Sequence, residues 1–296
     1  MLKRVREIID RYRVEDGKKF RLKDVDPADT AGLKSEIKDE AKQLLAQGVE
    51  RMSELQDMLY AQDRWSLLLI FQAMDAAGKD GTIKHVMSGL NPQGCQVHSF
   101  KTPSNEELDH DFLWRTSCRL PERGKIGIFN RSYYEEALVV RVHQQLLETQ
   151  KLPPELITKD IWKERFKDIR HFESYLTRNG TKVRKFFLHV SQDEQKKRFL
   201  ERLEEPEKNW KFSAADVRER QSWKAYQEAY EDLVQHTATR EAPWFVVPAD
   251  NKWFTRLVVA AVVVEALQSM KLAYPTVDGK KRAELIKAKT ELEKEK

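Results

Sequence analysis

Residues 65–82 read WSLLLIFQAMDAAGKDGT. The first part, residues 67–71, is a continuous apolar run, which is typical of a strand buried on both faces of a parallel sheet. The run then breaks into residues 73–80, AMDAAGKD, which follow the phosphate-loop frame of a small residue, four further residues and Gly-Lys. Such a loop wraps backbone N–H groups around phosphate oxygens at a helix N-terminus, and its Lys adds a positive charge. The stretch therefore predicts phosphoryl chemistry.

This loop departs from the usual frame, because Ala73 replaces the first Gly and Asp80 replaces the usual Ser or Thr. An ordinary strand-to-helix turn is the alternative, but the buried strand before the loop and a predicted helix at 82–90 favour a phosphate site. Asp75 would repel an anionic substrate unless a cation lay between them. We therefore interpret Asp75 as a Mg²⁺ ligand or as a base near the acceptor, with a turn-capping side chain as the alternative.

Composition limits the class of partner. The chain has 296 residues, of which 40% are hydrophobic and 34% charged, enough for one large α/β domain or two average ones. Its 53 basic and 48 acidic residues give a net charge of +5, and both signs are mixed along most predicted helices. A nucleic-acid-binding protein would usually concentrate the excess in a stripe with exposed aromatics. The sequence favours an anionic substrate in a local basic channel, with no nucleic acid as partner.

The two cysteines, Cys95 and Cys118, lack metal-ligand spacing and indicate a reducing compartment. The N-terminus lacks the apolar core of a secretory signal, and the longest apolar run, residues 257–264, is too short to span a bilayer. We expect a cytoplasmic protein without a membrane partner.

Four more short strands alternate with helical patterns, so the sequence predicts an α/β fold. The expected architecture is a three-layer αβα sandwich of the P-loop kinase type around a five-stranded parallel sheet. The expected strands are 67–71, 95–101, 125–129, 183–190 and 244–247, and the expected helices include 33–62, 82–90, 105–116 after a capping box at Ser104 and Glu107, 134–148, 154–178, 213–236 and 253–272. We expect one domain over 1–296, with an N-terminal arm and long helix at 1–62, a catalytic core at 63–272 that includes a helical lid at about 196–220, and a charged helical tail at 273–296.

Two further groups of residues are candidates for binding phosphate. Asn130 and Arg131 follow the strand at 125–129, and ligands of open α/β sheets sit beyond the carboxyl ends of the strands. The planar fork of Arg131 suits an acceptor phosphate, although a surface ion pair is the alternative. The second group is a set of bases around the predicted lid, for which a solvated helix is an equal alternative; its members are Lys196, Lys197, Arg198, Arg202, Lys208 and Lys211.

Three blocks then carry a family resemblance: FQAMDAAGKDGTIKHVMSGLNPQG from residue 71, FKTPSNEELDHDFLWR from residue 100 and LPERGKIGIFNRSYYEEALVVRVH from residue 120. Together they resemble the second polyphosphate kinase family over nearly the whole chain. The resemblance implies a fold similar to thymidylate kinase and Mg²⁺-dependent transfer of a terminal phosphoryl group from inorganic polyphosphate to a nucleotide. It also implies a homodimer or homotetramer, since members of the family tend to form these assemblies.

The resemblance assigns roles residue by residue. Asp75 matches the Mg²⁺-binding aspartate of the loop, Lys79 the phosphate-binding lysine, Arg131 the arginine of the second motif, and Arg198 the lid arginine. Asn130 stands where many members carry Asp; its carbonyl oxygen can still coordinate Mg²⁺, or Mn²⁺ as the alternative metal, directly or through a water. The form of residues 130–136, with Val-Val before Arg141, resembles the subgroup that accepts both AMP and ADP.

The predicted site is therefore a set of three overlapping groups. The catalytic candidates are Asp75, Lys79, Arg131 and Arg198. The phosphate-binding candidates are Ala76, Ala77, Gly78, Lys79, Asp80, Gly81, Lys84, Arg202, Lys208 and Lys211. The candidates for binding an adenine or guanine nucleotide are Asn130, Arg131, Tyr134, Glu135 and Arg141. Two rival functions stay open: an ATP-dependent nucleoside monophosphate kinase and a non-enzymatic polyanion-binding protein.

Overall fold

The central strand of the sheet is β2 (Ser66–Ala73), which is buried from Ser66 to Gln72. The computed structural model describes residues 2–33, 38–210 and 212–295, with the backbone alone at 2–4, 38–40 and 208. β2 pairs in parallel with β4 (Ile126–Asn130) and with β5 (Thr181–His189). β3 (Cys95–Ser99) adds to β4, and β6 (Trp244–Pro248) adds to β5, both in parallel. The five predicted strands and their parallel pairing are confirmed.

The prediction of a purely parallel, five-stranded sheet is nevertheless wrong. A sixth strand, β1 (Arg13–Val14), pairs antiparallel with β6, so the sheet is mixed and its order is β1-β6-β5-β2-β4-β3. Two residues are too few to show a period-2 pattern, and β1 exists because the N-terminal arm runs along the edge of β6. The coarse class, α/β, is as predicted.

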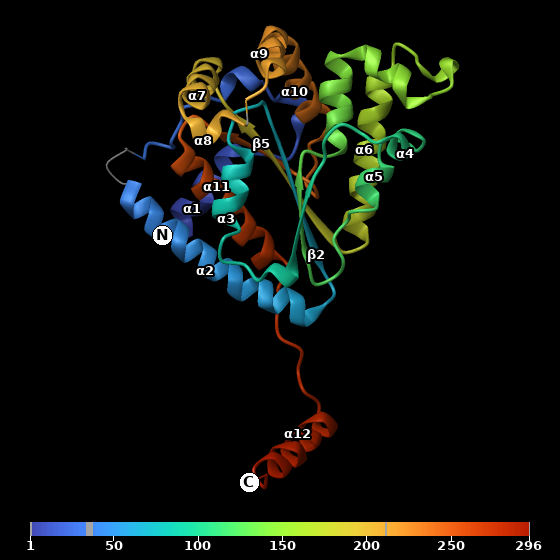
Figure 1. The fold of residues 1–296 in the computed structure, drawn as a ribbon. Coiled ribbons are helices and arrows are strands. Elements are labelled where there is room, and N and C mark those ends of the chain that lie inside the picture. Colours follow the sequence, from blue (N-terminus) through green and yellow to red (C-terminus); the bar gives the residue numbers. More distant parts are fainter. Residues whose placement is uncertain (1, 34–37, 211, 296) are drawn as a thin grey trace.

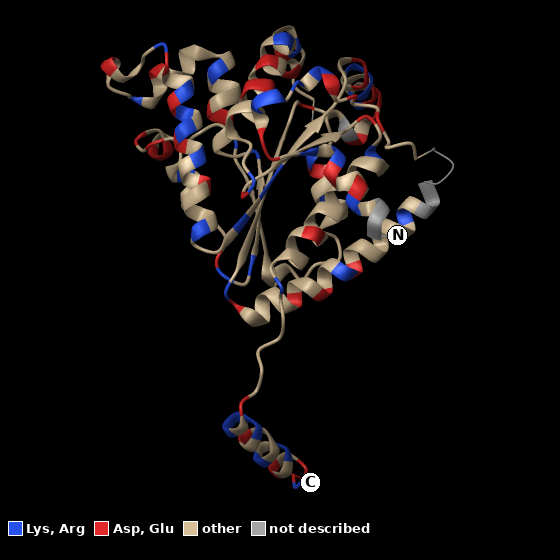
Figure 2. Ribbon diagram, turned by 180° about the vertical axis from the view of Figure 1, so that it is seen from behind, with Lys and Arg blue, Asp and Glu red and all other residues tan. Residues whose placement is uncertain are grey.

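Helices cover both faces of this sheet (Figure 1). On one face, α11 (Lys252–Ser269) packs against α1 (Leu2–Tyr12), α2 (Lys38–Gln62) and α3 (Lys79–Val86). α6 (Ile161–Arg178) and α10 (Trp223–Thr237) lie together on the other. α11 is apolar around most of its circumference, since it is enclosed between the sheet and α2. Charged residues of both signs are interspersed along the outer helices (Figure 2), which matches the mixed charge of the sequence.

Several predicted helices are divided in the structure. The helix expected at 105–116 consists of two single turns, α4 (Asn105–Leu108) and α5 (Trp114–Ser117), although its capping box between Ser104 and Glu107 is present. The region 134–148 contains a 3₁₀ turn (Tyr133–Glu135), a π-helical turn (Glu136–Val140) and a second 3₁₀ segment (Gln144–Gln150). Glu136 binds Arg165 and Gln150 in this region, so tertiary contacts override the helical pattern.

Prolines and polar side chains divide the others. A 3₁₀ turn (Pro154–Leu156) precedes α6, and α9 (Ala214–Glu219) and a 3₁₀ turn (Arg220–Ser222) precede α10. α7 (Gln192–Glu204) and the short α8 (Pro206–Asn209) come before them in the chain. α12 (Gly279–Leu292) projects away from the rest of the molecule on an extended segment (Figure 1) and is exposed along its length. Within the described residues, no helix has the length and apolar character needed to cross a membrane.

The N-terminal arm, which precedes α2, is hydrogen-bonded to the core at two places. Its 3₁₀ turns, Gly17–Lys19 and Leu22–Asp24, lie on α10, where the amide of Leu22 donates to Glu231 at 2.7 Å. Further along, the carbonyl of Pro27 accepts from the amide of Asp250 at 3.1 Å. The arm therefore reaches the carboxyl edge of the sheet.

Replacement of Gly17 tests whether this docking stabilises the fold. A Cβ at Gly17 would lie 2.3 Å from the carbonyl oxygen of Gln235, so the arm or α10 must shift. We expect Gly17→Ala to lower the free energy of unfolding by about 1–3 kcal/mol in urea titrations. Gly279→Ala is the matched control, since nothing lies within 4 Å of its Cβ. Equal stability of the two variants would contradict close docking of the arm.

His189, at the end of β5 beneath the arm, makes stability depend on pH. Burial lowers the pKa of His189 from 6.5 to about 4, and Asp26 with the Val25 backbone opposes this only in part. Between these values the unfolded chain binds a proton that the folded chain does not, so the free energy of unfolding should fall by about 3 kcal/mol as pH drops from 6.5 toward 4. His189→Gln should flatten this part of the urea-denaturation profile, whereas His171→Gln, at an exposed position of α6, should leave it unchanged.

Candidate active site

The phosphate loop forms a tight turn between β2 and α3. Ala76 has φ +61° and Gly78, the N-cap of α3, has φ +101°, so both lie in the left-handed region. The amide of Ala77 closes the turn onto the carbonyl of Met74 at 3.2 Å, and α3 begins directly at Lys79, three residues earlier than predicted. This brings the first amides of α3 next to the loop, which is the backbone arrangement of an anion site.

Lys79 is held inside the loop. Its Nζ donates to the carbonyl oxygen of Ala73 at 2.9 Å, which fixes the ammonium beneath the turn. Burial lowers the pKa of Lys79, while the carboxylates of Asp75, Glu135 and Asp80 oppose that change. A cation that is already partly removed from water interacts strongly with a bound phosphate.

Asp75 and Arg131 connect the loop with the end of β4. Nη2 of Arg131 lies 3.3 Å from Oδ1 of Asp75, and both side chains are partly exposed. Burial opposes the charged form of Arg131, but Glu135 and Asp75 outweigh it, so its pKa is raised. The backbone of Arg131 is left-handed, with φ +65°, which is unusual for a residue with a side chain. The two opposed charges face each other across the entrance to the loop.

Asn130 is oriented by the loop as well. Its Nδ2 donates to Oδ1 of Asp80 at 2.7 Å, so the residue that replaces Ser or Thr in the loop bonds the residue that replaces Asp on β4. The two departures from the usual frames are thus in contact.

These residues line a cavity of about 1030 Å³ at the carboxyl edge of the sheet. The structure brings most of the predicted site to this cavity: Asp75, Ala76, Ala77, Gly78, Lys79, Asp80, Gly81, Asn130, Arg131, Arg198 and Arg202. Each lies after β2 or at the end of β4, at the start of α3, or on α7, so most of them lie at the edge where ligands of open α/β sheets bind.

Other predicted residues lie elsewhere. Tyr134 is fully buried and its hydroxyl donates to Glu173, which corrects its assignment to nucleotide binding. Arg141 pairs with Asp232 on α10, and Lys84 lies on the exposed face of α3; neither lines the cavity. Glu135 accepts a bond from Gln72 at 3.0 Å beside the loop.

The remaining two candidates belong to the predicted lid. Only the backbone of Lys208 is described, and Lys211 lies outside the described residues.

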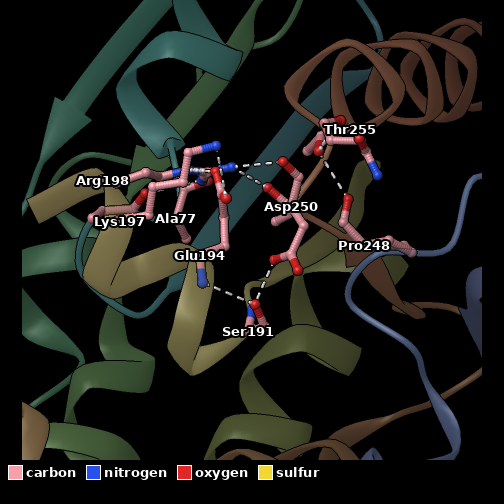
Figure 3. Close-up of polar contacts among 11 residues, drawn as sticks. Ala77, Ser191, Glu194, Lys197, Arg198, Pro248, Asp250 and Thr255 are labelled. Carbon is pink, nitrogen blue, oxygen red and sulfur yellow. Dashed lines mark hydrogen bonds and ion pairs between the residues drawn. The ribbon is translucent and has the colours of Figure 1, made fainter. Parts of the chain in front are cut away.

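Arg198 has a different place from the one its lid assignment implies (Figure 3). It is 4% exposed, and its five N–H donors all bond protein oxygens: Glu194 Oε1, the carbonyls of Ala76 and Ala77, and the carbonyls of Ala249 and Asp250. The guanidinium therefore ties α7 and the segment after β6 to the underside of the phosphate loop. In this conformation Arg198 holds the loop instead of presenting its charge to solvent.

The cavity residues that the sequence reasoning missed include Lys101, Trp210, Asp216, Lys252 and Arg256. The strand-end rule would have found Lys101 after β3, and also Lys252 after β6 with Arg256 one turn later on α11. Asp216 shows no such signal in the sequence. Its pKa is raised by burial and by Asp75, so two carboxyl groups share this space.

The oxygen-donor chemistry of the cavity fits a hard divalent cation. Asp75, Asp80, Asn130 and Asp216 all line it. Among the described residues no three His, Cys, Asp or Glu side chains form a ready-made metal cage. This combination suits a cation such as Mg²⁺ that keeps several waters and binds through one or two carboxylates together with substrate phosphates.

A phosphate loop, facing bases and oxygen ligands at the carboxyl edge of an α/β sheet define a phosphoryl-transfer enzyme. A sequence model of the family "Polyphosphate kinase 2 (PPK2)" matches residues 35–275. The chain therefore belongs to the polyphosphate kinase 2 family and is a phosphotransferase. Kinases of this family generally depend on a divalent metal.

Named relatives agree with this placement. The chain is 55% identical over 258 residues to the ADP-polyphosphate phosphotransferase of Rhodopseudomonas palustris, covering 87% of this chain and 89% of that protein. It is 43% identical over 265 residues to the AMP/ADP-polyphosphate phosphotransferase of Meiothermus ruber, covering 90% and 95%. The crystal structure of polyphosphate kinase 2 from Arthrobacter aurescens superposes with a TM-score of 0.85 at 40% identity, over 95% of this chain and 96% of that one.

The position of Arg198 predicts a specific lesion. Arg198→Lys keeps the charge but offers at most three donors, so buried carbonyls of the loop lose partners. We expect the free energy of unfolding to fall by about 2–4 kcal/mol and turnover to fall at temperatures where the variant is still folded. Lys197→Gln is the control: the side chain of Lys197, next to Arg198 in the chain, is 67% exposed, so stability should change by less than about 0.5 kcal/mol. Wild-type stability of Arg198→Lys would show that the five bonds are dispensable.

Proposed function

We propose that the protein transfers the terminal phosphoryl group of inorganic polyphosphate to AMP and ADP, giving ADP and ATP. The observation that carries the proposal is the single cavity in which Lys79, Arg131, Arg202, Lys252 and Arg256 gather from four separate elements. Its volume of about 1030 Å³ is at the upper end of ligand sites and offers room for a polyanion beside a nucleotide. The names of the relatives from R. palustris and M. ruber support the same donor and acceptors.

In this proposal, different parts of the cavity bind the phosphate donor and the nucleotide acceptor. Lys79 and the first amides of α3 bind the phosphoryl group that is transferred. Arg131, at the end of β4, binds the phosphate of the acceptor. Asn130 lies beside Arg131 on the acceptor side, and Glu135, outside the cavity lining, favours the charged form of Arg131. Lys101, Arg202, Lys252 and Arg256 neutralise further phosphates of the chain.

Positioning and charge neutralisation supply the catalysis in this scheme. A nucleotide phosphate is already ionised near neutral pH, so the site needs no strong base. Asp75, with Asn130 beside it, would hold Mg²⁺, or Mn²⁺ in its place, and the metal would supply charge neutralisation between donor and acceptor phosphates. The Asp75–Arg131 pair orients both side chains before substrate binds.

In the proposed enzyme, the catalytic core and a lid occupy separate parts of the chain. Residues 63–272 form the catalytic core, and α7, α8 and α9 form a lid over about 196–220 that contributes Arg202, Trp210 and Asp216 to the cavity. Arg198 acts there as a positioning residue beneath the loop. In the assembly that we propose, two or four copies of the chain associate.

A donor-exchange assay tests the function. The protein is incubated with Mg²⁺ and AMP or ADP, with either long-chain polyphosphate or ATP as donor, and products are separated by chromatography. We expect rapid product formation from polyphosphate with both acceptors. Rapid turnover of AMP with ATP alone would indicate an ATP-dependent monophosphate kinase, and salt-sensitive binding without turnover would indicate a polyanion-binding protein.

Lys79→Ala and Asp75→Ala test the site within the same assay. Each should lower turnover by about a thousandfold or more, because each removes a charge placed for the transition state. Thermal melting should show that both variants are folded. Substantial residual activity in either variant would overturn the role assigned to that residue.

A further inference from the structure

The left-handed backbone of Arg131 requires support. A non-glycine residue in this region is strained, and such a residue persists only where its surroundings fix it. Its amide donates to the carbonyl of Phe71 on β2 at 3.0 Å, which fixes the side toward the phosphate loop. On the other side, Ser132 is fully buried and its hydroxyl accepts from the amide of Tyr134 at 3.1 Å. The next anchors along the chain are the side chains of Tyr133 and Tyr134.

Both tyrosines end in a buried polar network. Their hydroxyls donate to the same oxygen of Glu173 on α6, Oε1, at 2.9 and 2.7 Å. Nζ of Lys185 on β5 donates to the other oxygen, Oε2, at 2.6 Å, to the hydroxyl of Tyr134 at 3.1 Å and to the carbonyl of Thr237 at 2.8 Å. The four side chains are between 0 and 2% exposed.

The network is complete in its hydrogen bonds. The three N–H donors of Lys185 and both oxygens of Glu173 have partners. Burial, reinforced by Glu173, raises the pKa of both tyrosines well above the ordinary value, so their hydroxyls stay protonated and continue to donate. A buried ion pair often adds little net stability compared with apolar packing of the same volume, but a fully bonded one admits a single geometry. The network therefore fixes the positions of the two tyrosines.

We infer that Tyr133, Tyr134, Glu173 and Lys185 are positioning residues that hold the backbone of Arg131 and so aim its guanidinium at the acceptor phosphate. The inference rests on the proposed role of Arg131 in binding the acceptor. The network shares no bonded residue with the Arg198 contacts that hold the phosphate loop, within the described part of the chain. Loosening it should therefore affect the acceptor without affecting the donor.

The double variant Tyr133→Phe/Tyr134→Phe removes both hydroxyls and keeps both rings. We expect KM for AMP and ADP to rise about tenfold or more, with a smaller loss in kcat, while KM for polyphosphate stays within about twofold. Val263→Ala is the control, because it opens a cavity at a fully buried position of α11 outside the network. It should lower thermal stability without changing the ratio of the two KM values. If the double variant melts below the assay temperature, the single variant Tyr133→Phe gives the same comparison.

A mutant cycle with Arg131→Ala separates the inference from the function on which it rests. Arg131→Ala alone should raise KM for the nucleotide, and adding the two Phe substitutions should raise it no further, since they act through Arg131. If Arg131→Ala leaves that KM unchanged, the proposed role of Arg131 fails. If Arg131→Ala raises it but the Phe variants match Val263→Ala, or if donor and acceptor KM rise together, the network is structural and the inference fails.

Discussion

The active site depends on one buried guanidinium. A loop with two left-handed residues, Ala76 and Gly78, is not fixed by its backbone alone, because Ala76 is strained there and Gly78 has many competing conformations. Arg198 removes that freedom by donating to the carbonyls of Ala76 and Ala77 from below while it is held by Glu194, Ala249 and Asp250. The charge of Arg198 thus acts through the backbone. The carbonyls of Ala76 and Ala77 are occupied by Arg198 on the inner side of the loop.

On the acceptor side of the cavity, buried hydrogen bonds also lie behind a left-handed backbone, but other groups make them. Arg131 is also left-handed, and the buried Lys185–Glu173 pair with two tyrosines lies behind it. Each strained residue costs about 1–3 kcal/mol, and the hydrogen bonds behind the site offset that cost. Asp75 of the phosphate loop faces Arg131, so the two opposite charges are already paired before any phosphate binds. The backbone of the site is therefore held by buried contacts, and the bases of α7 and α11 line the cavity around it.

Much of this arrangement was predictable from the sequence, because it follows from rules that act locally. The apolar run at 67–71 predicted β2, and the strand-end rule placed Asn130 beside the loop, where it bonds Asp80. The sequence patterns gave wrong predictions where contacts between residues far apart in the chain determine the structure. β1 exists only because β6 offers an edge, and Tyr134 and Arg198 were assigned to substrate although both are buried. A basic or aromatic residue next to a motif has the same sequence signature whether it faces the ligand or supports the backbone that does.

The pairing of β1 with β6 has a consequence for the order in which the chain is made. An uncovered β6 edge would offer the N–H and C=O groups of an apolar strand to any other extended chain. Residues 13–14 leave the ribosome long before residues 244–248, so the segment that covers this edge is already present when β6 forms. Pro248 at the far end of β6 has no N–H to offer. The segment that pairs with the β6 edge is thus already synthesised when the last strand of the sheet forms, so no later part of the chain is needed to pair with that edge.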